Sequence, residues 1–363
     1  MKIRGAVMYE YNTPLVVEEL DLDPPGPGEV LVKMAASGVC HSDYREFKGE
    51  WAGRGDVQLP EVLGHEGAAV VQEVGPGVTS VKPGDHAVLS FHPNCGKCYY
   101  CIKGRSNLCE NLVAADSTRL RKGSQTISTF AGLATFAEYN VVSEAAVITI
   151  PDDVPLDKAA LVGCGVTTGV GAALNTAQVG AGESVAVFGT GGVGLSIIQG
   201  AALSGADPII AVDIRENKLA FAREFGATHT INALEEDPVG AIKGLTQSRG
   251  VQYAFEAIGD TKVAVQALAS VCKGGKAVIV GQSPYDDMIT FPGRMLWEEA
   301  QLIGSYYGSS RMHLFMPRLI ELYQAGKLKL DELVTRTFTL DQINEAFEAL
   351  EAGEVARGVI RYD

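Results

Sequence analysis

The sequence predicts an α/β protein in which a β-rich part is followed by a doubly wound parallel sheet. Residues 1 to about 160 hold short apolar runs that are separated by turn signals rich in Pro and Gly. From Glu183 onward, apolar runs of strand length alternate with segments of helical pattern, which is typical of a parallel sheet covered by helices. A glycine-rich turn, Gly189–Gly194, follows the first of these later strands.

The length and composition indicate a globular chain with two domains. At 363 residues the chain is longer than most single domains, and its 46% content of hydrophobic residues is enough for a large core. We expect one domain from residues 1–163 together with 307–363, and a second domain from residues 164–306.

Each element of this prediction rests on a local pattern. In the first part, the strand candidates are three apolar runs: Val30–Val32, Ala68–Val74 and His86–Leu89. In the second part, we expect strands at 184–188, 208–213, 228–231, 251–255, 276–281 and 302–306, and helices at 192–204, 215–225, 238–248 and 260–272. The last segments, which we expect to return to the first domain, are the helices Met312–Ala325 and Leu340–Ala352 and the strand Gly358–Arg361.

The charge excludes two classes of partner. A net charge of −14 argues against binding to nucleic acid or to an anionic membrane surface. No apolar run reaches the ~18 residues of a membrane span, and the first twelve residues contain no apolar signal stretch. We therefore expect a cytoplasmic protein that acts on small molecules.

Four cysteines in one short segment predict a structural metal site: Cys95, Cys98, Cys101 and Cys109. Their C-x2-C-x2-C-x7-C spacing lets four thiolates close a tetrahedral shell around Zn²⁺, which leaves no position for a substrate. Disulfides are an alternative, but a chain that is not exported keeps its thiols reduced. An iron–sulfur cluster is another alternative, and it would leave the remaining cysteines unexplained.

A second set of possible ligands, Cys40, His65 and Cys164, predicts a catalytic metal site. Three protein ligands leave a fourth position for water or substrate, which is how a catalytic zinc site is built. Cys164 stands at an apparent helix start, where the thiolate form is favoured. Each of these residues alone could be an ordinary buried side chain, but all three occur beside a structural zinc segment.

The glycine-rich turn predicts a dinucleotide site. Gly189, Gly191 and Gly194 form a G-x-G-x-x-G between a strand and a helix, and Gly192 lies inside this motif. The pyrophosphate is expected at the amide groups of the helix start. Asp213, at the end of the next strand, is expected to accept hydrogen bonds from the ribose and to repel a 2′-phosphate, which favours NAD over NADP.

Taken in order, these motifs resemble those of the zinc-dependent, medium-chain alcohol dehydrogenases along nearly the whole chain. The resemblance rests on Gly38–Asp43, Gly64–Glu66, the four cysteines, Gly163–Gly165, Gly189–Gly194, Asp213 with Lys218, and the tail from Ala356 and Arg357. The chain looks most similar to the subgroup with a long segment after the four cysteines, here roughly 110–135, which includes the class III, glutathione-dependent formaldehyde dehydrogenases.

The resemblance implies a GroES-like catalytic domain, a Rossmann coenzyme domain, NAD and two zinc ions per chain. We also expect a homodimer in which sheet edges near residues 301–306 pair across a two-fold axis, and the long segment after the four cysteines resembles that of dimeric relatives. The resemblance also implies residue roles. At the catalytic zinc, Ser42 would take the proton of the alcohol, Asp43 would orient His65, and Glu66 would support the ligands or bind the zinc transiently. The implied cofactor contacts are His41 and Arg357 for the pyrophosphate, Lys218 for the ribose, and Thr168 and Val193 for the nicotinamide. Phe91 resembles a wall of the substrate pocket, and packing in the core is an equal alternative for it. For Lys218, an equal alternative is a solvated lysine on the surface of a helix.

The chain departs from this pattern at several positions. Arg45 stands where many relatives have a histidine that ends the proton relay, and arginine cannot shuttle a proton, so we expect water to complete the relay. His41 replaces an arginine of some relatives, which predicts faster release of NADH. An additional segment, Glu50–Gly55, precedes His65 and predicts a different substrate preference.

The leading functional prediction is an NAD-dependent zinc alcohol dehydrogenase that acts on a primary, or also a secondary, alcohol or aldehyde. A dehydrogenase of the formaldehyde–thiol adduct (S-hydroxymethylglutathione type) ranks second, because no arginine follows Cys109 closely. The nearest cations, Arg119, Arg121 and Lys122, are displaced. A non-catalytic nucleotide-binding protein is the alternative of another class, and the complete set of Cys40, His65 and Cys164 argues against it.

Overall fold

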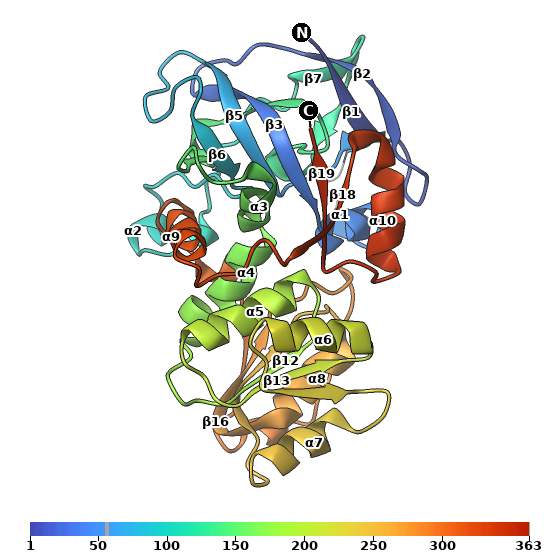
Figure 1. Cartoon of the computed structure of the whole chain (residues 1–363). Coiled ribbons are helices and arrows are strands. Elements are labelled where there is room, and N and C mark those ends of the chain that lie inside the picture. The colour runs from blue at the N-terminus through green and yellow to red at the C-terminus, as the bar shows by residue number, and fades with distance from the viewer. Residues whose placement is uncertain (55–57, 363) are drawn as a thin grey trace. The chain divides into compact units, whose positions relative to one another are not determined.

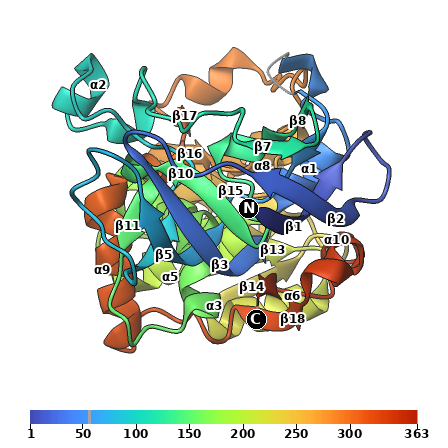
Figure 2. The same ribbon diagram turned by 90° about the horizontal axis from the view of Figure 1, so that it is seen from above.

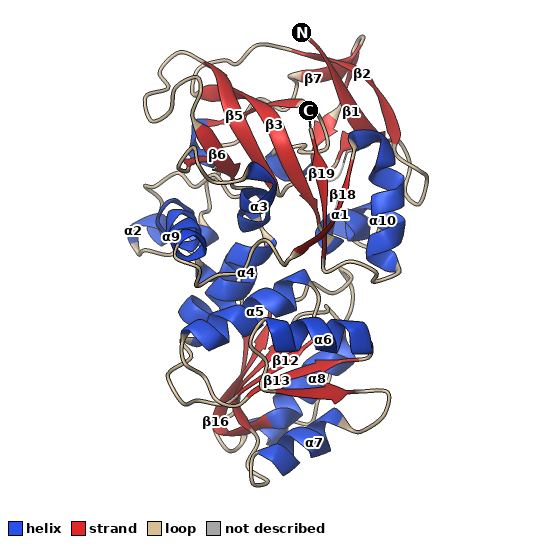
Figure 3. Cartoon of the chain, viewed as in Figure 1, coloured by secondary structure: helices blue, strands red, loops and turns tan. Residues whose placement is uncertain are grey.

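The computed structural model describes residues 1–54 and 58–362, and they form two compact units (Figure 1). The first unit consists of residues 1–164 and 311–363, and the second of residues 165–310. The expected additional segment Glu50–Gly55 therefore ends on a residue outside the described part. Strands dominate the first unit, whereas helices alternate with strands in the second (Figure 3). The predicted α/β class is confirmed.

The strands of the first unit form two sheets. One has the order β8-β7-β2-β1-β4-β9, and the other has the order β11-β6-β5-β3-β19-β18 with β10 also paired to β3. The strands are β1 (Lys2–Met8), β2 (Val16–Leu22), β3 (Glu29–Val39), β4 (Glu61–Val62), β5 (Gly67–Val74), β6 (His86–Leu89), β7 (Leu120–Lys122), β8 (Gln125–Thr126), β9 (Ser128–Thr129), β10 (Tyr139–Ser143), β11 (Val147–Thr149), β18 (Val334–Phe338) and β19 (Arg357–Arg361).

The long strand β3 organises the second of these sheets. Its first half pairs with β10 and its second half with β19. Strand β5 runs along the other edge of β3 (Figure 2). The antiparallel register places Gly358 opposite Val39, so the C-terminal strand lies beside the end of β3. Cys40, the first predicted ligand, follows this end directly.

The helices of the first unit are short except for the two near the C-terminus. They are α1 (His41–Phe47), α2 (Tyr99–Ile102), α3 (Leu156–Ala159), α9 (Met312–Gln324) and α10 (Ile343–Glu351). Helix α10 buries Ile343, Ala346, Phe347 and Leu350, which recur at the spacing of one helix face.

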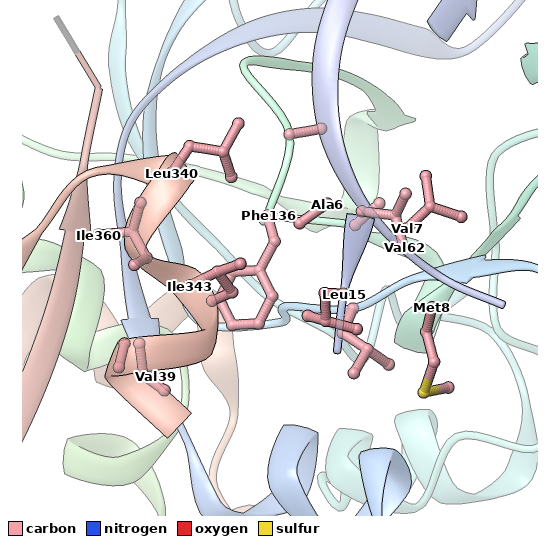
Figure 4. Packing of buried hydrophobic residues seen from close by; sticks show 14 of the residues in the cluster. Ala6, Val7, Met8, Leu15, Val39, Val62, Phe136, Leu340, Ile343 and Ile360 are labelled. Carbon is pink, nitrogen blue, oxygen red and sulfur yellow. The ribbon is translucent and has the colours of Figure 1, made fainter. Parts of the chain in front are cut away.

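A hydrophobic core packs this face of α10 against the first sheet (Figure 4). Ile343 and Ile360 come from the C-terminal segment, whereas Ala6 and Val7 come from β1. Phe136 is fully buried and lies between these groups in Figure 4. The core therefore joins the two ends of the chain within one unit.

The second unit is a parallel six-stranded sheet in the order β14-β13-β12-β15-β16-β17. The order is that of a doubly wound dinucleotide-binding fold. Every residue of β12 is buried, as expected where helices cover both faces. The strands are β12 (Val185–Phe188), β13 (Ile209–Asp213), β14 (His229–Asn232), β15 (Val251–Glu256), β16 (Val271–Ile279) and β17 (Gln301–Gly304).

The helices of the second unit are α4 (Gly165–Gly171), α5 (Gly192–Leu203), α6 (Glu216–Glu224), α7 (Pro238–Leu245) and α8 (Thr261–Ser270). Helix α4 continues into a π-helical segment, Ala172–Ala177. Within the described residues, no single helix has the length and apolar character needed to cross a membrane. The stretches Leu156–Gly163 and Gly165–Ala177 meet that criterion only when they are counted together across a bend.

Candidate active site

The three predicted ligands of the catalytic metal converge in the first unit. They are Cys40, His65 and Cys164. Their ligand atoms all lie within 4.8 Å of one another, and His65 Nε2 is 3.2 Å from Cys164 Sγ. All three side chains are buried. Zn–N and Zn–S bonds of about 2.1 and 2.3 Å in a tetrahedral shell imply separations of roughly 3.5 to 3.8 Å between ligand atoms. The three side chains therefore fit a zinc ion with one position left open.

Three different structural elements deliver these ligands. Cys40 directly follows β3 and is the N-cap of α1, and Cys164 directly precedes α4, in agreement with its predicted position at a helix start. His65 follows Gly64, whose φ of +94° belongs to the left-handed region that favours glycine. A Cβ atom on Gly64 would lie 2.5 Å from Thr135 Oγ1, so the turn before His65 also requires a residue without a side chain.

Asp43 holds two of the ligands through one buried carboxylate. Its Oδ1 accepts a hydrogen bond from the Gly64 amide at 3.0 Å and lies 2.9 Å from His65 Nδ1. Its Oδ2 accepts a hydrogen bond from the Cys40 amide at 3.2 Å. A proton on Nδ1 directed at Asp43 leaves Nε2 free to bind a metal, which is the usual arrangement behind a zinc-bound histidine.

The electrostatics of the cluster favour a thiolate at Cys40. The hydrogen bond with Cys164, together with His65, holds the pKa of Cys40 well below its usual value despite burial. Burial alone would lower the pKa of His65, but the charge and hydrogen bond of Asp43, with Cys40, outweigh it and raise this pKa to about 10. The thiolate is the form of cysteine that binds a metal ion, and a bound metal ion would displace the proton from His65 Nε2.

Glu66 and Arg357 form a buried ion pair beside this cluster. The pair joins Glu66 Oε2 to a guanidinium nitrogen of Arg357, and both side chains are almost inaccessible. We expected Glu66 to support the ligands or to bind zinc transiently, and its carboxylate is bound by Arg357. Arg357, expected at the pyrophosphate, is therefore also the counter-ion of Glu66.

Two aromatic rings flank His65. The ring of Phe91 lies 5.4 Å from the imidazole and that of Phe130 lies 5.5 Å from it, both in edge-on geometry. Phe91 was predicted as a pocket wall, whereas Phe130 was not predicted at all. No periodicity or motif marks Phe130 in the long segment 110–135, since its role arises from a contact between distant parts of the chain.

The remaining predicted residues near Cys40 lie in the first turn of α1. Ser42 is half-buried and His41 is exposed. Arg45 lies one helical turn after Ser42 and forms an ion pair with Glu50. The guanidinium is thus directed to a carboxylate of the additional segment.

The four clustered cysteines form a second site in the first unit. Their sulfur atoms all lie within 4.8 Å of one another, with 3.5 Å between Cys95 and Cys109 and 3.8 Å between Cys98 and Cys109. A disulfide requires about 2.05 Å, whereas a tetrahedral Zn–S4 site implies about 3.8 Å. Backbone amides of Cys101 and Glu110 lower the pKa of Cys98 to about 6, which favours the thiolate that binds zinc.

In the second unit, the glycine motif has the predicted local structure. Gly189 adopts a φ of +86° directly after β12, and Gly191 is the N-cap of α5. A Cβ atom on Gly194 would lie 1.9 Å from the Gly189 carbonyl, so the helix can pack this close to the turn only with glycine there. Gly192 and Val193 form the first turn of α5 and are half-buried. The amide groups at this helix start are available for a pyrophosphate.

Asp213 and Lys218 lie next to this turn. The Asp213 carboxylate accepts hydrogen bonds from the amide and hydroxyl of Thr190 at 2.8 and 2.9 Å, and from the amides of Ile214 and Arg215 at 2.8 and 3.1 Å. Burial lowers the pKa of Lys218, and the charge of Asp213 offsets part of this shift. Thr168, the last predicted cofactor contact, is half-buried on α4.

Comparison with known proteins agrees with this geometry. Residues 26–152 match the family model of the alcohol dehydrogenase GroES-like domain, and residues 192–324 match that of the zinc-binding dehydrogenases. The chain is 39% identical to S-(hydroxymethyl)glutathione dehydrogenase of Paracoccus denitrificans, with 100% of both chains covered. It is 38% identical to alcohol dehydrogenase class-3 of Cereibacter sphaeroides, with 99% of this chain and 100% of the relative covered.

A solved structure gives the same result. The crystal structure of benzyl alcohol dehydrogenase from Acinetobacter calcoaceticus matches with a TM-score of 0.92 and 34% identity, and 100% of both chains is covered. These similarities confirm the predicted fold class, the predicted enzyme class and the predicted cofactors, NAD and zinc. The chain belongs to the zinc-dependent, medium-chain alcohol dehydrogenase family.

Proposed function

We propose that Cys40, His65 and Cys164 hold the catalytic zinc of an enzyme that transfers a hydride between a primary alcohol or aldehyde and NAD. The convergence of these three buried side chains, with Asp43 behind His65, is the observation that carries the proposal. The four cysteines at 95–109 hold the structural zinc. When bound, zinc lowers the pKa of a coordinated alcohol, as it lowers that of water to about 7, and NAD accepts the hydride.

The residues of the chain prepare this reaction. Asp43 keeps His65 in the tautomer that presents Nε2 to the metal. Ser42, in the turn after Cys40, takes the proton from the alcohol hydroxyl and passes it to water. The rings of Phe91 and Phe130 exclude water from one side of His65 and pack against the carbon chain of the substrate.

For the cofactor, we propose contacts that follow the geometry of the second unit. The turn of Gly189, Gly191, Gly192 and Gly194 accepts the pyrophosphate, and Asp213 with Lys218 binds the adenosine ribose. A carboxylate at this point disfavours a 2′-phosphate, which supports NAD. Thr168 and Val193 of this unit are proposed at the nicotinamide. His41 and Arg357 belong to the first unit, and their proposed contact with the pyrophosphate rests on the resemblance to the family alone.

A specific observation separates the two candidate substrates. The three cations that could bind the carboxylate of a glutathione adduct are each engaged by an acid of the first unit: Arg119 by Glu29, Arg121 by Asp23 and Lys122 by Glu18. The aromatic rings near His65, in contrast, suit an apolar alcohol. We therefore rank apolar primary alcohols, including aromatic ones such as the benzyl alcohol of the structural relative, above the thiol adduct.

The experiment that tests this function follows NADH absorbance in the wild type and two cysteine variants. Cys164→Ser removes a proposed ligand, whereas Cys272→Ser changes a cysteine outside both sulfur clusters. We expect NAD reduction with benzyl and aliphatic primary alcohols in the wild type and in Cys272→Ser, and its loss in Cys164→Ser. Turnover only with formaldehyde plus glutathione would promote the second candidate, and full activity in Cys164→Ser would refute the proposed site.

A further inference from the structure

The last described residue, Tyr362, reaches from the C-terminus to a backbone group near the zinc site. Its amide donates to the Ala35 carbonyl at 3.0 Å, which extends the pairing of β19 with β3 by one residue. Its half-buried ring packs against two hydrophobic clusters of the first unit. Its hydroxyl donates a hydrogen bond to the Thr135 carbonyl at 2.6 Å. Both the backbone and the ring thus fix the position of this hydroxyl.

Thr135 is in turn bonded to the turn that carries His65. Its amide donates to the Gly64 carbonyl at 2.9 Å, and the Phe136 amide donates to the Leu63 carbonyl at 3.1 Å. The Thr135 hydroxyl lies 2.6 Å from that of Ser37 on β3. Thr135 is fully buried, and the turn at residues 135–136 rests directly against residues 63–64.

The Gly64 amide leads on to the ligand itself. It donates to Asp43 Oδ1, the same oxygen that lies 2.9 Å from His65 Nδ1. A continuous set of hydrogen bonds therefore runs from Tyr362 through Thr135 and Gly64 to Asp43 and His65.

The backbone just before Thr135 is strained, and two hydrogen bonds restrain it. Ala131 and Ala134 both adopt a φ of +53°, a conformation that is unfavourable for a residue other than glycine. Asn140 holds the Ala134 carbonyl with a hydrogen bond of 2.9 Å, and Tyr362 holds the next carbonyl. Without these bonds, the segment is free to relax away from Gly64.

We propose that Tyr362 is a positioning residue for His65, which acts by holding Thr135 against the Gly64 turn. The inference rests on the proposed role of His65 as a zinc ligand. It predicts that the Tyr362 hydroxyl matters for the catalytic zinc and not for the structural zinc, because the described hydrogen bonds from Tyr362 lead to His65.

The test compares zinc release from Tyr362→Phe and Tyr139→Phe, each purified as the full chain with both sites filled. Tyr139 is a matched control: it is half-buried and packs against the same cluster, and its hydroxyl makes no hydrogen bond within the described part of the chain. Release into a chromogenic chelator, 4-(2-pyridylazo)resorcinol, is followed over time. A Cys40→Ser sample identifies the catalytic phase, because that phase should be missing from it.

We expect Tyr362→Phe to release the catalytic zinc roughly threefold to tenfold faster than the wild type, at the low end of the effects known for residues behind a metal ligand. The structural phase and Tyr139→Phe should match the wild type. With Co²⁺ in the catalytic site, the d–d absorption bands of Tyr362→Phe should shift, and kcat should fall while the KM for NAD stays constant.

Equal acceleration of both phases, or unchanged rates in Tyr362→Phe, would overturn the inference. Equal acceleration would mean that the hydroxyl supports only the general stability of the protein. Unchanged rates would mean that it supports neither this stability nor the catalytic zinc site. A wild type with a single zinc would instead refute the proposed function, so the two failures are distinguishable.

Discussion

Asp43 shows how one side chain can determine the geometry of a metal site. Its two oxygens serve the Cys40 amide, the Gly64 amide and the His65 ring, so it fixes the positions of two ligands together. Burial raises the pKa of this carboxyl, and the nearby His65 offsets part of the shift. A buried carboxylate lowers the stability of a protein unless its charge is compensated by a partner such as His65.

Replacement of Asp43 by Asn should weaken the catalytic zinc by about 10- to 100-fold. The amide keeps the shape of the carboxylate but loses its charge, and its nitrogen cannot accept a hydrogen bond. Chelator competition would measure the affinity of this site. Asp260→Asn is the matched control, since Asp260 caps α8 in the second unit and Asn caps helices equally well. An unchanged affinity in Asp43→Asn would show that the carboxylate is dispensable.

Arg45 carries a prediction about proton transfer. Arginine stays protonated at working pH and is paired with Glu50, so this side chain cannot accept the proton from Ser42. In Arg45→His, a group with an ordinary pKa of about 6.5 replaces it, and kcat/KM should gain a rise with pH near that value as the imidazole loses its proton. Glu50→Gln breaks the same ion pair without adding a base and should leave the shape of the profile unchanged. An identical pH profile in Arg45→His would argue against any relay role here.

The residues that the sequence could and could not identify differ in a physical way. The four cysteines at 95–109 lie in one short segment, and so do the glycines of the dinucleotide motif. In each case the spacing of the residues alone predicts that they form one site. Phe130 and His65 are brought together only by the folded chain, and no local pattern marks such a contact. Glu66 and Arg357 are separated by 291 positions, so no local pattern predicts their ion pair.

Among the secondary-structure elements, α1 and α10 form an aromatic contact that supports the site. Phe347 of α10 is buried, and its ring lies 5.7 Å from that of Tyr44, 5.3 Å from that of Phe47 and 6.1 Å from that of Phe136. Tyr44 and Phe47 belong to α1, which also carries Ser42 and Asp43. Helix α10 therefore fixes the position of α1 through Phe347.

Truncation of this aromatic contact should destabilise the first unit. We expect Phe347→Ala to lower the free energy of unfolding by about 3 to 5 kcal/mol, because it removes a buried ring and leaves a cavity. Denaturant unfolding would measure the change. Leu314→Ala, at a side chain that is 67% exposed on α9, should change stability by less than about 0.5 kcal/mol. Equal effects in the two variants would contradict this role of α10.

The boundaries of α8 and β16 were not predicted correctly by the local sequence pattern. The helix expected at 260–272 ends at Ser270, because Val271 already belongs to β16. A register irregularity between Val251 and Tyr253 lets β16 begin this early. The other strands and helices of the second unit lie within a few residues of their expected positions, since buried parallel strands have nearly continuous apolar runs.

One edge of the parallel sheet in the second unit is formed by strand β17. Strand β17 is the last strand of the parallel sheet and pairs only with β16 within the described residues. An edge strand of this kind offers free backbone groups to a second copy. We propose a homodimer that pairs along β17 across a two-fold axis.

Two lysines on this edge should prevent such pairing. Gln301 and Gly304 are exposed, so the double variant Gln301→Lys/Gly304→Lys places charge at the proposed interface without filling the core. Light scattering after size exclusion should give twice the chain mass for the wild type and one chain mass for the variant. Leu234→Lys, at a residue that is 75% exposed in the same unit, should remain a dimer. A wild type that is monomeric, or a double variant that still dimerises, would contradict this interface.

We propose that each chain holds one catalytic and one structural zinc ion. Elemental analysis of zinc per chain, combined with NADH formation from a primary alcohol in the same sample, is the first measurement to make. We expect two zinc ions per chain with turnover, and one zinc ion without turnover in Cys40→Ser. The proposal is wrong if the wild type has one zinc ion and no turnover, or if it keeps full turnover after loss of the zinc at Cys40, His65 and Cys164.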